Sequence, residues 1–467
     1  MVHASTAHAQ GPVPITLETR ADPIVAHSGI GSLVAMEGDH VAVVGTNGSP
    51  FLPGTAYIFN RHTGAQVSRF DPTSIGSLRP FNGIDIESDI AVVASQNSDI
   101  VGEIPGTIWT FDVATGQQRH TLHEPPFAQE SITSFGRDVS MSGGVILTAD
   151  PLQGEHGLGY LFDAASGTFL RTLGLTTARG PGSWLGQTLE IEGSLAALSE
   201  SPYDALGNNS HGVVLFDVET GVESGRLVVE GDYRIDSIGI TDDYLVLGRP
   251  RMPHPDDVIP EDSFGGWTGV IEIYDRESLE LVNSIYHPLA NDDTEFGRRI
   301  EVDGDYLLTS LDLNSQVWLY KLSTGEHVGE VVHPFSHGMA GFDLQDDVIF
   351  AGSPGTDYFD EKGDFVVNPG AVYRYNFTPT PPRVAGDYDG NGIVDEDDYA
   401  RWHSSFGSST ELAADGNDNG VVDLADYTVW RDRVPLPVAN SVPEPGAAFL
   451  LVGVLVSIRA SRPRTSR

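Results

Sequence analysis

Residues 107–116 read TIWTFDVATG, a run of β-branched and aromatic residues followed by a short turn that ends in Thr115-Gly116. Such residues favour extended strands, and glycine supplies the backbone conformation that a tight turn needs. The segment therefore predicts a strand that leads into a hairpin. Six further segments share its pattern: TAYIFN, LGYLFD, GVVLFD, VIEIYD, QVWLYK and AVYRYN. Three of them lead into the same Thr-Gly ending, at Thr63-Gly64, Thr220-Gly221 and Thr324-Gly325.

A second series of apolar runs keeps step with the first. Each run follows a turn that contains Gly or Asp, and the seven runs read HVAVVG, IAVVAS, VILTAD, LAALSE, YLVLGR, YLLTSL and VIFAGS. Together the two series define seven units with a mean spacing of about 51 residues. Each unit predicts four short strands, which is the period and content of a β-propeller blade. The expected fold class is therefore mainly β, with a seven-bladed β-propeller over residues 12–378.

The two ends of the repeat indicate how the ring closes. The seventh unit ends at AVYRYNFTPTPP, residues 371–382, without a fourth strand. Residues Thr16–Pro23 resemble the fourth strand of the fifth unit, Val282–Pro288, and a glycine follows each at a similar distance. We therefore expect the first strand to pair with Val372–Phe377 and complete the last blade, because closure removes exposed sheet edges.

Phe-Gly pairs open two of the units, at Phe135-Gly136 and Phe296-Gly297, and Gly-rich stretches precede the Phe-Asp strands. In this respect residues 15–377 resemble bacterial FG-GAP propellers, which are distantly related to the integrin head. The calcium loops of some FG-GAP blades are missing from this sequence, so we expect no metal in the propeller. Quinoprotein-like propellers share Asp-x-x-Thr-Gly, but they add a regularly placed Trp that this chain lacks.

After a Pro-rich linker, residues 379–385, the pattern changes. Residues 386–402 read GDYDGNGIVDEDDYARW, and the same spacing returns 28 residues later. Both copies place oxygen-bearing side chains at positions 1, 3, 5, 9 and 12, a glycine at position 6 and a backbone carbonyl at position 7 of a twelve-residue calcium loop. The candidate ligands are Asp387, Asp389, Asn391, Ile393, Asp395 and Asp398 in the first copy, and Asp415, Asn417, Asn419, Val421, Asp423 and Asp426 in the second. The sequence thus predicts two bound Ca²⁺ ions.

Residues 386–435 resemble a type I dockerin, which consists of two duplicated loop–helix units with Asp rather than Glu at position 12. The resemblance implies a small α-helical module that folds on binding two Ca²⁺ ions and docks onto a cohesin-like partner. Dockerins use positions 10 and 11 to recognise the cohesin. This chain has Glu396-Asp397 at those positions in one half and Leu424-Ala425 in the other.

Both ends of the chain carry addressing patterns. Residues 1–11 contain Ala7-His8-Ala9, which resembles a signal-peptidase site; we interpret this stretch as the remnant of an export signal or, alternatively, as a disordered tail. In the linker 436–446, Pro443, Glu444 and Pro445 precede the apolar run and the arginines of residues 447–467. This order resembles a PEP-CTERM sorting signal, which implies processing by an exosortase in the inner membrane of certain Gram-negative bacteria. A twelve-residue apolar helix would reach only about 18 Å, which predicts transient contact with a membrane.

Composition narrows the classes of partner and of chemistry. The net charge of −40, from 66 acidic and 26 basic residues, argues against nucleic acid and anionic membranes as binding partners. The absence of cysteine excludes disulfides and thiol chemistry. The sequence has no G-x-S-x-G, H-E-x-x-H or G-x-x-x-x-G-K motif. His123, His287 and His333 recur at matching points of different units, which favours a structural role.

These features predict an exported binding or scaffold protein of the cell surface or extracellular matrix of a Gram-negative-type bacterium. Alternation of strand direction places three long insertions, Ser201–His211, Pro250–Trp267 and Ser353–Pro369, on one rim, with Arg137 and Arg298 near the channel. We expect a protein or glycan ligand on that rim. The alternative is a polysaccharide-acting hydrolase or lyase delivered by its dockerin-like module. A convergent acid pair at the channel mouth would favour the enzyme.

Overall fold

The structure of the chain, a computed structural model, divides into two compact units, Met1–Pro379 and Thr380–Arg467. The first unit is described at residues 16–21, 29–45, 54–72, 81–96, 106–125, 134–176, 183–201, 211–229, 231, 233–255, 268–287, 295–310, 316–332, 339–354, 358–359, 365–366 and 370–377. The second is described at residues 386, 388, 393–408, 412–416, 421–431 and 433–434. The proposed export remnant and the Pro-Glu-Pro motif with its tail lie outside these residues.

The first unit contains seven four-stranded sheets. Blade 1 holds β2 (Leu33–Glu37), β3 (His40–Gly45), β4 (Thr55–Asn60) and β5 (Gln66–Phe70). Blade 2 holds β6 (Gly83–Glu87), β7 (Ile90–Ser95), β8 (Thr107–Asp112) and β9 (Gln118–His123). Blade 3 holds β10 (Val139–Ser142), β11 (Val145–Asp150), β12 (Leu158–Asp163) and β13 (Phe169–Leu173). Blade 4 holds β14 (Leu189–Glu192), β15 (Leu195–Glu200), β16 (Gly212–Asp217) and β17 (Glu223–Val228).

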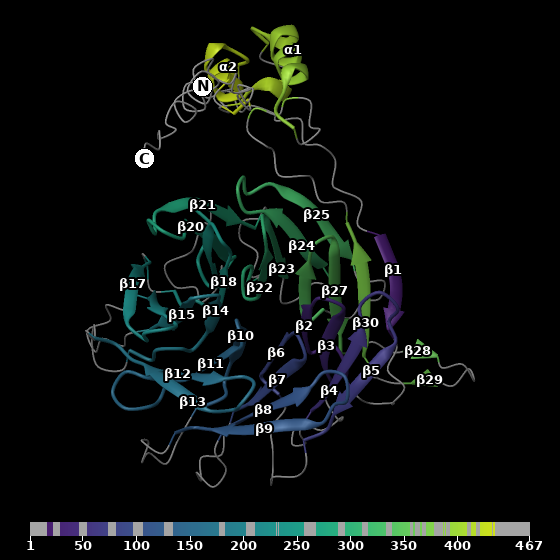
Figure 1. The fold of residues 1–467 in the computed structure, drawn as a ribbon, viewed down its shortest axis with the longest axis vertical. Helices are drawn as coiled ribbons and strands as arrows, with labels where there is room; N and C mark the ends of the chain where they lie inside the picture. The colour runs from purple at the N-terminus through teal and green to yellow at the C-terminus, as the bar shows by residue number, and fades with distance from the viewer. Residues whose placement is uncertain are drawn as a thin grey trace, which may run out of the picture. The chain divides into compact units, whose positions relative to one another are not determined.

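The remaining blades follow the same plan. Blade 5 holds β18 (Ser237–Ile240), β19 (Tyr244–Arg249), β20 (Val270–Asp275) and β21 (Leu281–Tyr286). Blade 6 holds β22 (Ile300–Asp303), β23 (Tyr306–Ser310), β24 (Gln316–Lys321) and β25 (His327–Val332). Blade 7 holds β26 (Phe342–Gln345), β27 (Val348–Ser353), β30 (Ala371–Asn376) and β1 (Thr16–Ala21), and a small hairpin of β28 (Tyr358–Phe359) and β29 (Phe365–Val366) lies in its second-to-third link. The seven sheets surround a common axis with their first strands innermost (Figure 1), which confirms the predicted seven-bladed propeller.

The apolar runs of the sequence become strands that are covered on both faces. Val41, Ala42, Val43 and Val44 of β3 are all fully buried, because blades 2 and 7 pack against the two opposite faces of blade 1, to which β3 belongs. Among the described residues, one hydrophobic cluster occupies each of the seven interfaces between neighbouring blades. Burial of apolar area between sheets therefore holds the ring together, and each blade depends on its neighbours.

Blade 7 joins the two ends of the propeller. β1 pairs antiparallel with β30 over a register that runs from Thr16 opposite Asn376 to Ala21 opposite Val372, with one irregularity between Leu17 and Thr19. Residues 16–21 thus form the fourth strand of the sheet that contains β26, β27 and β30.

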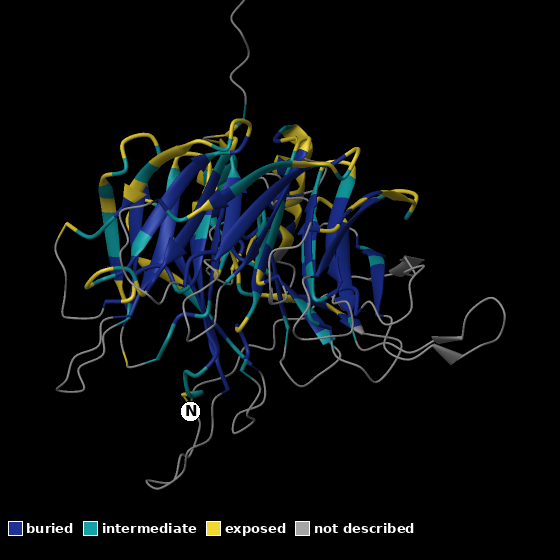
Figure 2. Ribbon diagram, turned by 90° about the horizontal axis from the view of Figure 1, so that it is seen from below, coloured by how far each residue is buried: buried dark blue, intermediate teal, exposed yellow. Residues whose placement is uncertain are grey.

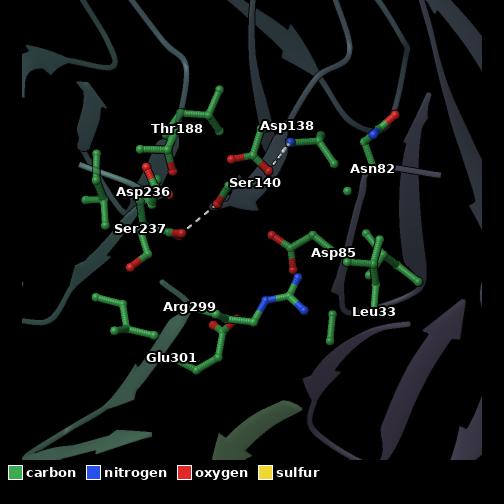
Figure 3. Close-up of a pocket in the computed structure, with 18 of the residues that line it drawn as sticks. Leu33, Asn82, Asp85, Asp138, Ser140, Thr188, Asp236, Ser237, Arg299 and Glu301 are labelled. Carbon is green, nitrogen blue, oxygen red and sulfur yellow. Dashed lines mark hydrogen bonds between the residues drawn. The ribbon is translucent and has the colours of Figure 1, made fainter. Parts of the chain in front are cut away.

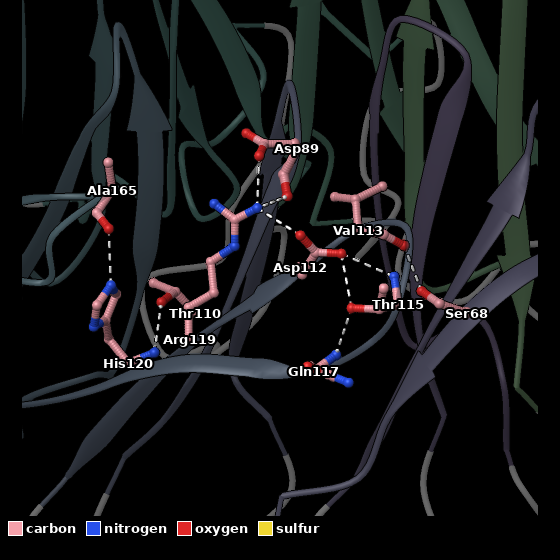
Figure 4. A network of polar contacts seen from close by, with 10 residues as sticks. All are labelled: Ser68, Asp89, Thr110, Asp112, Val113, Thr115, Gln117, Arg119, His120 and Ala165. Atoms are coloured by element: carbon pink, nitrogen blue, oxygen red, sulfur yellow. Dashed lines mark hydrogen bonds and ion pairs between the residues drawn. The ribbon is translucent and has the colours of Figure 1, made fainter.

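The hairpins that end in Thr-Gly are held by their own side chains (Figure 4). Asp112 Oδ1 accepts hydrogen bonds from the Thr115 backbone N–H at 2.9 Å and from Thr115 Oγ1 at 2.8 Å. The same pair of bonds forms between Asp163 and Ser166 and between Asp275 and Ser278. In these two hairpins Ser replaces the Thr of the predicted Thr-Gly endings.

These hairpins also contact the outer strand of the preceding blade. Ser68 Oγ on β5 donates to the Val113 carbonyl of blade 2 at 2.5 Å. His120 Nε2 on β9 lies 2.8 Å from the Ala165 carbonyl oxygen of blade 3 (Figure 4). A side chain at one position of the fourth strand therefore reaches the turn of the next blade.

The two rims of the propeller differ. In each blade the short turns from the first to the second strand and from the third to the fourth strand share one rim, because the strands alternate in direction. Figure 2 shows exposed turns along that rim and buried strands between the rims. The other rim carries the second-to-third links and the links between blades.

The described residues of the second unit form two helices, α1 (Glu396–Ser405) and α2 (Leu424–Arg431), and a short 3₁₀ turn, η1 (Leu412–Ala414). α1 begins after Asp395, whose side chain accepts the Asp397 backbone N–H, while Asp398 accepts the Asp395 backbone N–H in a capping box. Within the described parts of both units, no helix is long and apolar enough to cross a membrane.

Candidate functional site

A cavity of about 370 Å³ lies where the first strands of all seven blades converge. Side chains alternate along a strand, so every second residue of each first strand faces this central channel. Six acidic residues line the cavity: Asp85, Asp138, Glu190, Asp236, Glu301 and Asp343. Figure 3 shows Asp85, Asp138, Arg299 and Glu301 pointing into it.

Burial raises the pKa of Asp85, Asp138, Glu190, Glu301 and Asp343. The pKa of Asp138 rises to about 6, that of Asp85 to about 7 and that of Asp343 to about 8. The pKa values of Glu190 and Glu301 lie well above the usual range, first because of burial and then because of the neighbouring negative charges of Asp85 and Asp343, respectively. Because ionised carboxylates that share one channel repel one another, several of these acids keep their protons near neutral pH.

Two of the carboxylates tie neighbouring first strands together. Asp85 accepts the Ile86 backbone N–H at 2.7 Å on its own strand and the Met141 backbone N–H at 2.6 Å on β10. Asp343 makes the equivalent bonds to its own strand and to β2, accepting the Leu344 N–H at 2.7 Å and the Met36 N–H at 2.6 Å. These two acids therefore cap inner-strand edges, which is a structural task.

Glu190 and Glu301 have a different environment. Glu190 accepts a hydrogen bond from Ser140 Oγ at 2.8 Å, across the junction of blades 3 and 4. Glu301 is influenced by the Arg299 guanidinium, which partly offsets the rise of its pKa. Of the five acids whose pKa is raised, these two have no bond to the next blade's backbone among the described contacts, so they are the better candidates for contact with a ligand.

Arginines stand at the entrance of this cavity. Arg137 and Arg298 both line it, as predicted, together with Arg299. All three precede the first strand of their blade, which places them at the rim that carries the long links. Arg299 donates to the Ala340 carbonyl at 2.6 Å, and Arg298 pairs with Glu295. The channel is therefore acidic inside, and three arginines and Asp236 lie at this entrance.

Arg299 and these acids were not predicted from the sequence. For Asp85, Glu190, Glu301 and Asp343 a signal was present, because charged residues alternate with apolar ones in GIDIE, LEIE, IEVD and FDLQ, the first strands of blades 2, 4, 6 and 7. Such alternation indicates a strand with one polar face, and in a propeller that face borders the channel.

Two long insertions begin beside buried charges. β15 ends at Glu200, which is fully buried and pairs with Arg226 at 3.5 Å. β19 ends at Arg249, which is 1% exposed and donates to Glu272 at 2.8 Å; Glu272 also accepts from Tyr274 Oη at 2.9 Å. Most residues of the insertions themselves, including Tyr203 and Trp267, lie outside the described residues.

The calcium-loop candidates can be compared between the two halves of the second unit. Asp398 and Asp426, at position 12, are fully buried. In the first half Asp398 accepts the backbone N–H groups of position 2, Tyr388, at 2.6 Å and of position 9, Asp395, at 2.8 Å. In the second half Asp426 accepts those of Gly416 at 2.8 Å and Asp423 at 2.7 Å. The two loops close by the same hydrogen bonds.

Side-chain direction also agrees between the halves. Ile393 and Val421, at position 7, are 61% and 40% exposed, whereas the next residues, Val394 and Val422, are buried. Asp415, at position 1 of the second half, is buried as well. The remaining candidates, Asp387, Asp389, Asn391, Asn417 and Asn419, lie outside the described residues.

This donor set fits a hard cation. Position 12 is a carboxylate in each half, and an ionised carboxylate has about four lone-pair sites, so two N–H bonds leave others for a metal. The described residues alone contain no group of three or more acidic or histidine side chains arranged to hold a metal, so the remaining loop positions would have to complete each site.

His287, one of the three recurring histidines, has the packing of a structural residue. His287 is buried and stacks on Trp318 with ring centroids 5.0 Å apart. His123 ends β9 in blade 2, whereas His287 follows β21 in blade 5. His333 lies outside the described residues.

No model of a known protein family matches this chain, and no curated protein matches it either. Among solved structures, the β-propeller domain of Cps50 (Swd1) from Myceliophteria thermophila aligns with a TM-score of 0.51 and 11% identity, covering 78% of this chain and 100% of that one. Raptor from Chaetomium thermophilum aligns with the same score and identity over 79% of this chain and 29% of its own. BamB from Moraxella catarrhalis aligns with a TM-score of 0.44 and 14% identity over 78% and 98% of the two chains. The first two likenesses support the propeller fold and nothing narrower.

Proposed function

We propose that this chain is an exported, surface-associated binding protein. Its propeller would recognise a protein or glycan, its dockerin-like module would bind two Ca²⁺ ions and dock a cohesin-like partner, and its Pro-Glu-Pro tail would direct sorting by an exosortase. The observation that carries the binding role is the rim on which the long insertions begin, since Arg137, Arg298 and Arg299 line the channel entrance on the same side. Recognition concentrates on loops that a rigid scaffold positions.

The calcium role rests on the matched hydrogen bonds of the two loop–helix halves. Asp398 and Asp426 each hold positions 2 and 9 of their own loop. The two halves that repeat in sequence therefore also share the same hydrogen bonds. Such loops supply the carboxylate and carbonyl oxygens that Ca²⁺ prefers.

A binding screen on the purified chain tests the rim. A glycan array and a pull-down with calcium present should yield a ligand whose affinity falls when Arg298 is changed to Ala. Arg69→Ala is the matched control, because Arg69 is also half-exposed but belongs to an outer strand. Shortening Pro250–Trp267 should weaken the same ligand, whereas changes at the Thr-Gly turns should not. Equal loss from Arg298→Ala and Arg69→Ala would show that the rim is not the binding face.

A polysaccharide-acting hydrolase is the second candidate, and one observation favours it. Glu190 and Glu301 line a cavity with pKa values raised well above the usual range, and glycoside hydrolysis uses a carboxylic acid of raised pKa as its proton donor. A hydrolysis screen separates the two functions. Products that disappear in Glu301→Gln or Glu190→Gln would identify the enzyme, whereas binding without products would identify the receptor.

A further inference from the structure

Two equivalent hydrogen bonds join the halves of the C-terminal unit. Trp402 Nε1 on α1 donates to the backbone carbonyl of Asp423 at 2.8 Å, and Trp430 Nε1 on α2 donates to that of Asp395 at 2.6 Å. Asp395 and Asp423 occupy position 9 of the first and second loop. Each tryptophan therefore binds the loop that its own helix does not follow.

Together with the helices, these bonds connect the two loops in a continuous cycle of contacts. Asp398, the last residue of the first loop, lies on α1 one turn before Trp402, so both side chains project from one side of that helix. Trp402 leads to Asp423 of the second loop, and the Asp423 N–H leads to Asp426 at the start of α2. From Asp426 the path continues along α2 to Trp430 and back to the first loop. A shift of either helix therefore alters a ligand position in both loops.

Aromatic packing makes the two helices move together. Four rings, two from each helix, contact one another: Tyr399, Trp402, Tyr427 and Trp430. Across the interface Tyr399 contacts Trp430 and Trp402 contacts Tyr427, each with ring centroids 5.1 Å apart, and Tyr399 contacts Tyr427 at 6.1 Å. Tilting one helix without the other would separate these rings and break both tryptophan bonds.

We propose that Trp402 and Trp430 couple the two calcium loops into one cooperative unit, so that filling either loop raises the affinity of the other. The inference rests on the calcium role proposed above. Ion binding at one loop fixes its position 9 and position 12, and the tryptophan bonds extend that order to the second loop. By linkage the effect is the same in both directions.

Calcium titration of the full-length chain, first stripped with a chelator, measures the coupling. Calorimetry and tryptophan fluorescence should show two ions bound in one steep transition, with a Hill coefficient approaching about 2. Asp415→Ala disables the second loop, and we expect it to lower the affinity of the intact first loop by about tenfold. A protein with both Asp387→Ala and Asp415→Ala gives the background from other surface acids.

Substitution of each tryptophan by Phe tests its role in the coupling, because Phe keeps an aromatic ring and removes the N–H donor. In Trp402→Phe and Trp430→Phe both ions should still bind, with the Hill coefficient reduced to about 1. In Trp430→Phe, adding Asp415→Ala should no longer weaken the first loop. Trp184→Phe is the control, because Trp184 is an exposed tryptophan of the propeller. Far-ultraviolet circular dichroism of the loaded variants checks that α1 and α2 persist.

The outcomes separate the two proposals. If the wild-type chain binds no more Ca²⁺ than the double Asp→Ala protein, the proposed calcium role is wrong and the coupling falls with it. If two ions bind independently in the wild type, or if both Phe variants keep its steepness with intact helices, only the coupling is wrong. If one Phe variant loses its helices, Tyr388→Phe replaces it in the test. Tyr388 Oη donates to the Asp426 carbonyl at 2.6 Å, which is a further bond between the halves. Removing that bond should lower the Hill coefficient by itself.

Discussion

Gly225 on the fourth strand of blade 4 packs against Leu279 in a turn of blade 5, which is the reverse of the arrangement at other contacts between blades. Elsewhere the fourth strand carries a side chain, such as His120 or Asn283, that lies over the turn glycine of the next blade, Gly167 or Gly325. Between blades 4 and 5 the glycine is on the strand and the leucine is in the turn. A Cβ on Gly225 would lie 3.6 Å from Leu279 Cδ1, so each residue fits because of the other.

Reversing this exchange should reveal a favourable coupling. Gly225→Asn alone would press the new side chain against Leu279, and we expect a loss of about 1–2 kcal/mol in the free energy of unfolding. Leu279→Gly alone relieves a left-handed backbone (φ +57°) but removes the leucine contacts. The double variant recreates the Asn283–Gly325 arrangement, so its stability should exceed the additive value by about 1 kcal/mol. Urea denaturation of the four proteins gives the cycle, and strict additivity would contradict it.

A second pair of glycines separates backbone strain from contact between blades. Gly64 and Gly116 end equivalent turns and both have φ of +68°. A Cβ on Gly64 would meet no atom of the described residues within 4 Å, whereas one on Gly116 would overlap the Arg69 carbonyl of blade 1. Gly64→Ala should cost about 1 kcal/mol from strain alone, and Gly116→Ala about 3 kcal/mol or more. Equal melting temperatures of the two variants would show that the interface between blades 1 and 2 adjusts to the added methyl group at little cost.

The channel acids predict that stability falls as the pH rises above neutral. Unfolded Asp has a pKa of about 3.9, whereas in the folded chain the pKa of Asp85 is about 7 and that of Asp343 about 8. The folded state therefore holds more protons between these values, and their contribution to stability disappears as the pH rises through 7–8. His123 and His327, whose pKa values are lowered by burial, act in the opposite direction but below about pH 6.5.

Urea denaturation between pH 6.5 and pH 8.5 measures this slope. Asp343→Asn, which cannot ionise, should flatten it, and Asp163→Asn should leave it unchanged because Asp163 lies in an exposed hairpin where its pKa is lowered. Rising stability over this range would show that the channel carboxylates are ionised in the folded protein.

Removing the first strand should open the ring. A chain that starts at residue 25 lacks β1 and exposes the edge of β30, whereas a chain that starts at residue 16 retains the whole pairing from Thr16 to Ala21. We expect the shorter protein to lose cooperative unfolding and to associate through the exposed edge. Calorimetry and size-exclusion chromatography compare the two. Equal melting of both truncated chains would refute the role of β1 in holding blade 7.

Local patterns in the sequence were sufficient for the blades and for the loop positions, since both depend on residues close together in the chain. The strand TIWTFD and its turn at Thr115-Gly116 lie where they were predicted. The acids of the channel were not foreseen, because the role of Asp85 depends on Met141, which belongs to the next blade. The Trp402–Asp423 bond could not be predicted either, since it spans 21 residues and joins the first helix to the second loop.

Gly416 limits how alike the two halves of the C-terminal unit can be. A Cβ on Gly416 would overlap the Tyr388 hydroxyl, although both residues occupy position 2 of their loops. Two tyrosines would compete for one volume at the seam between the halves, and two glycines would remove the bond from Tyr388 to the Asp426 carbonyl. If the halves descend from one duplicated segment, the copies could not both keep the tyrosine and this packing. Divergence at this position is thus a condition of the fold, and exchanging one half for a second copy of the other would give a module that cannot close.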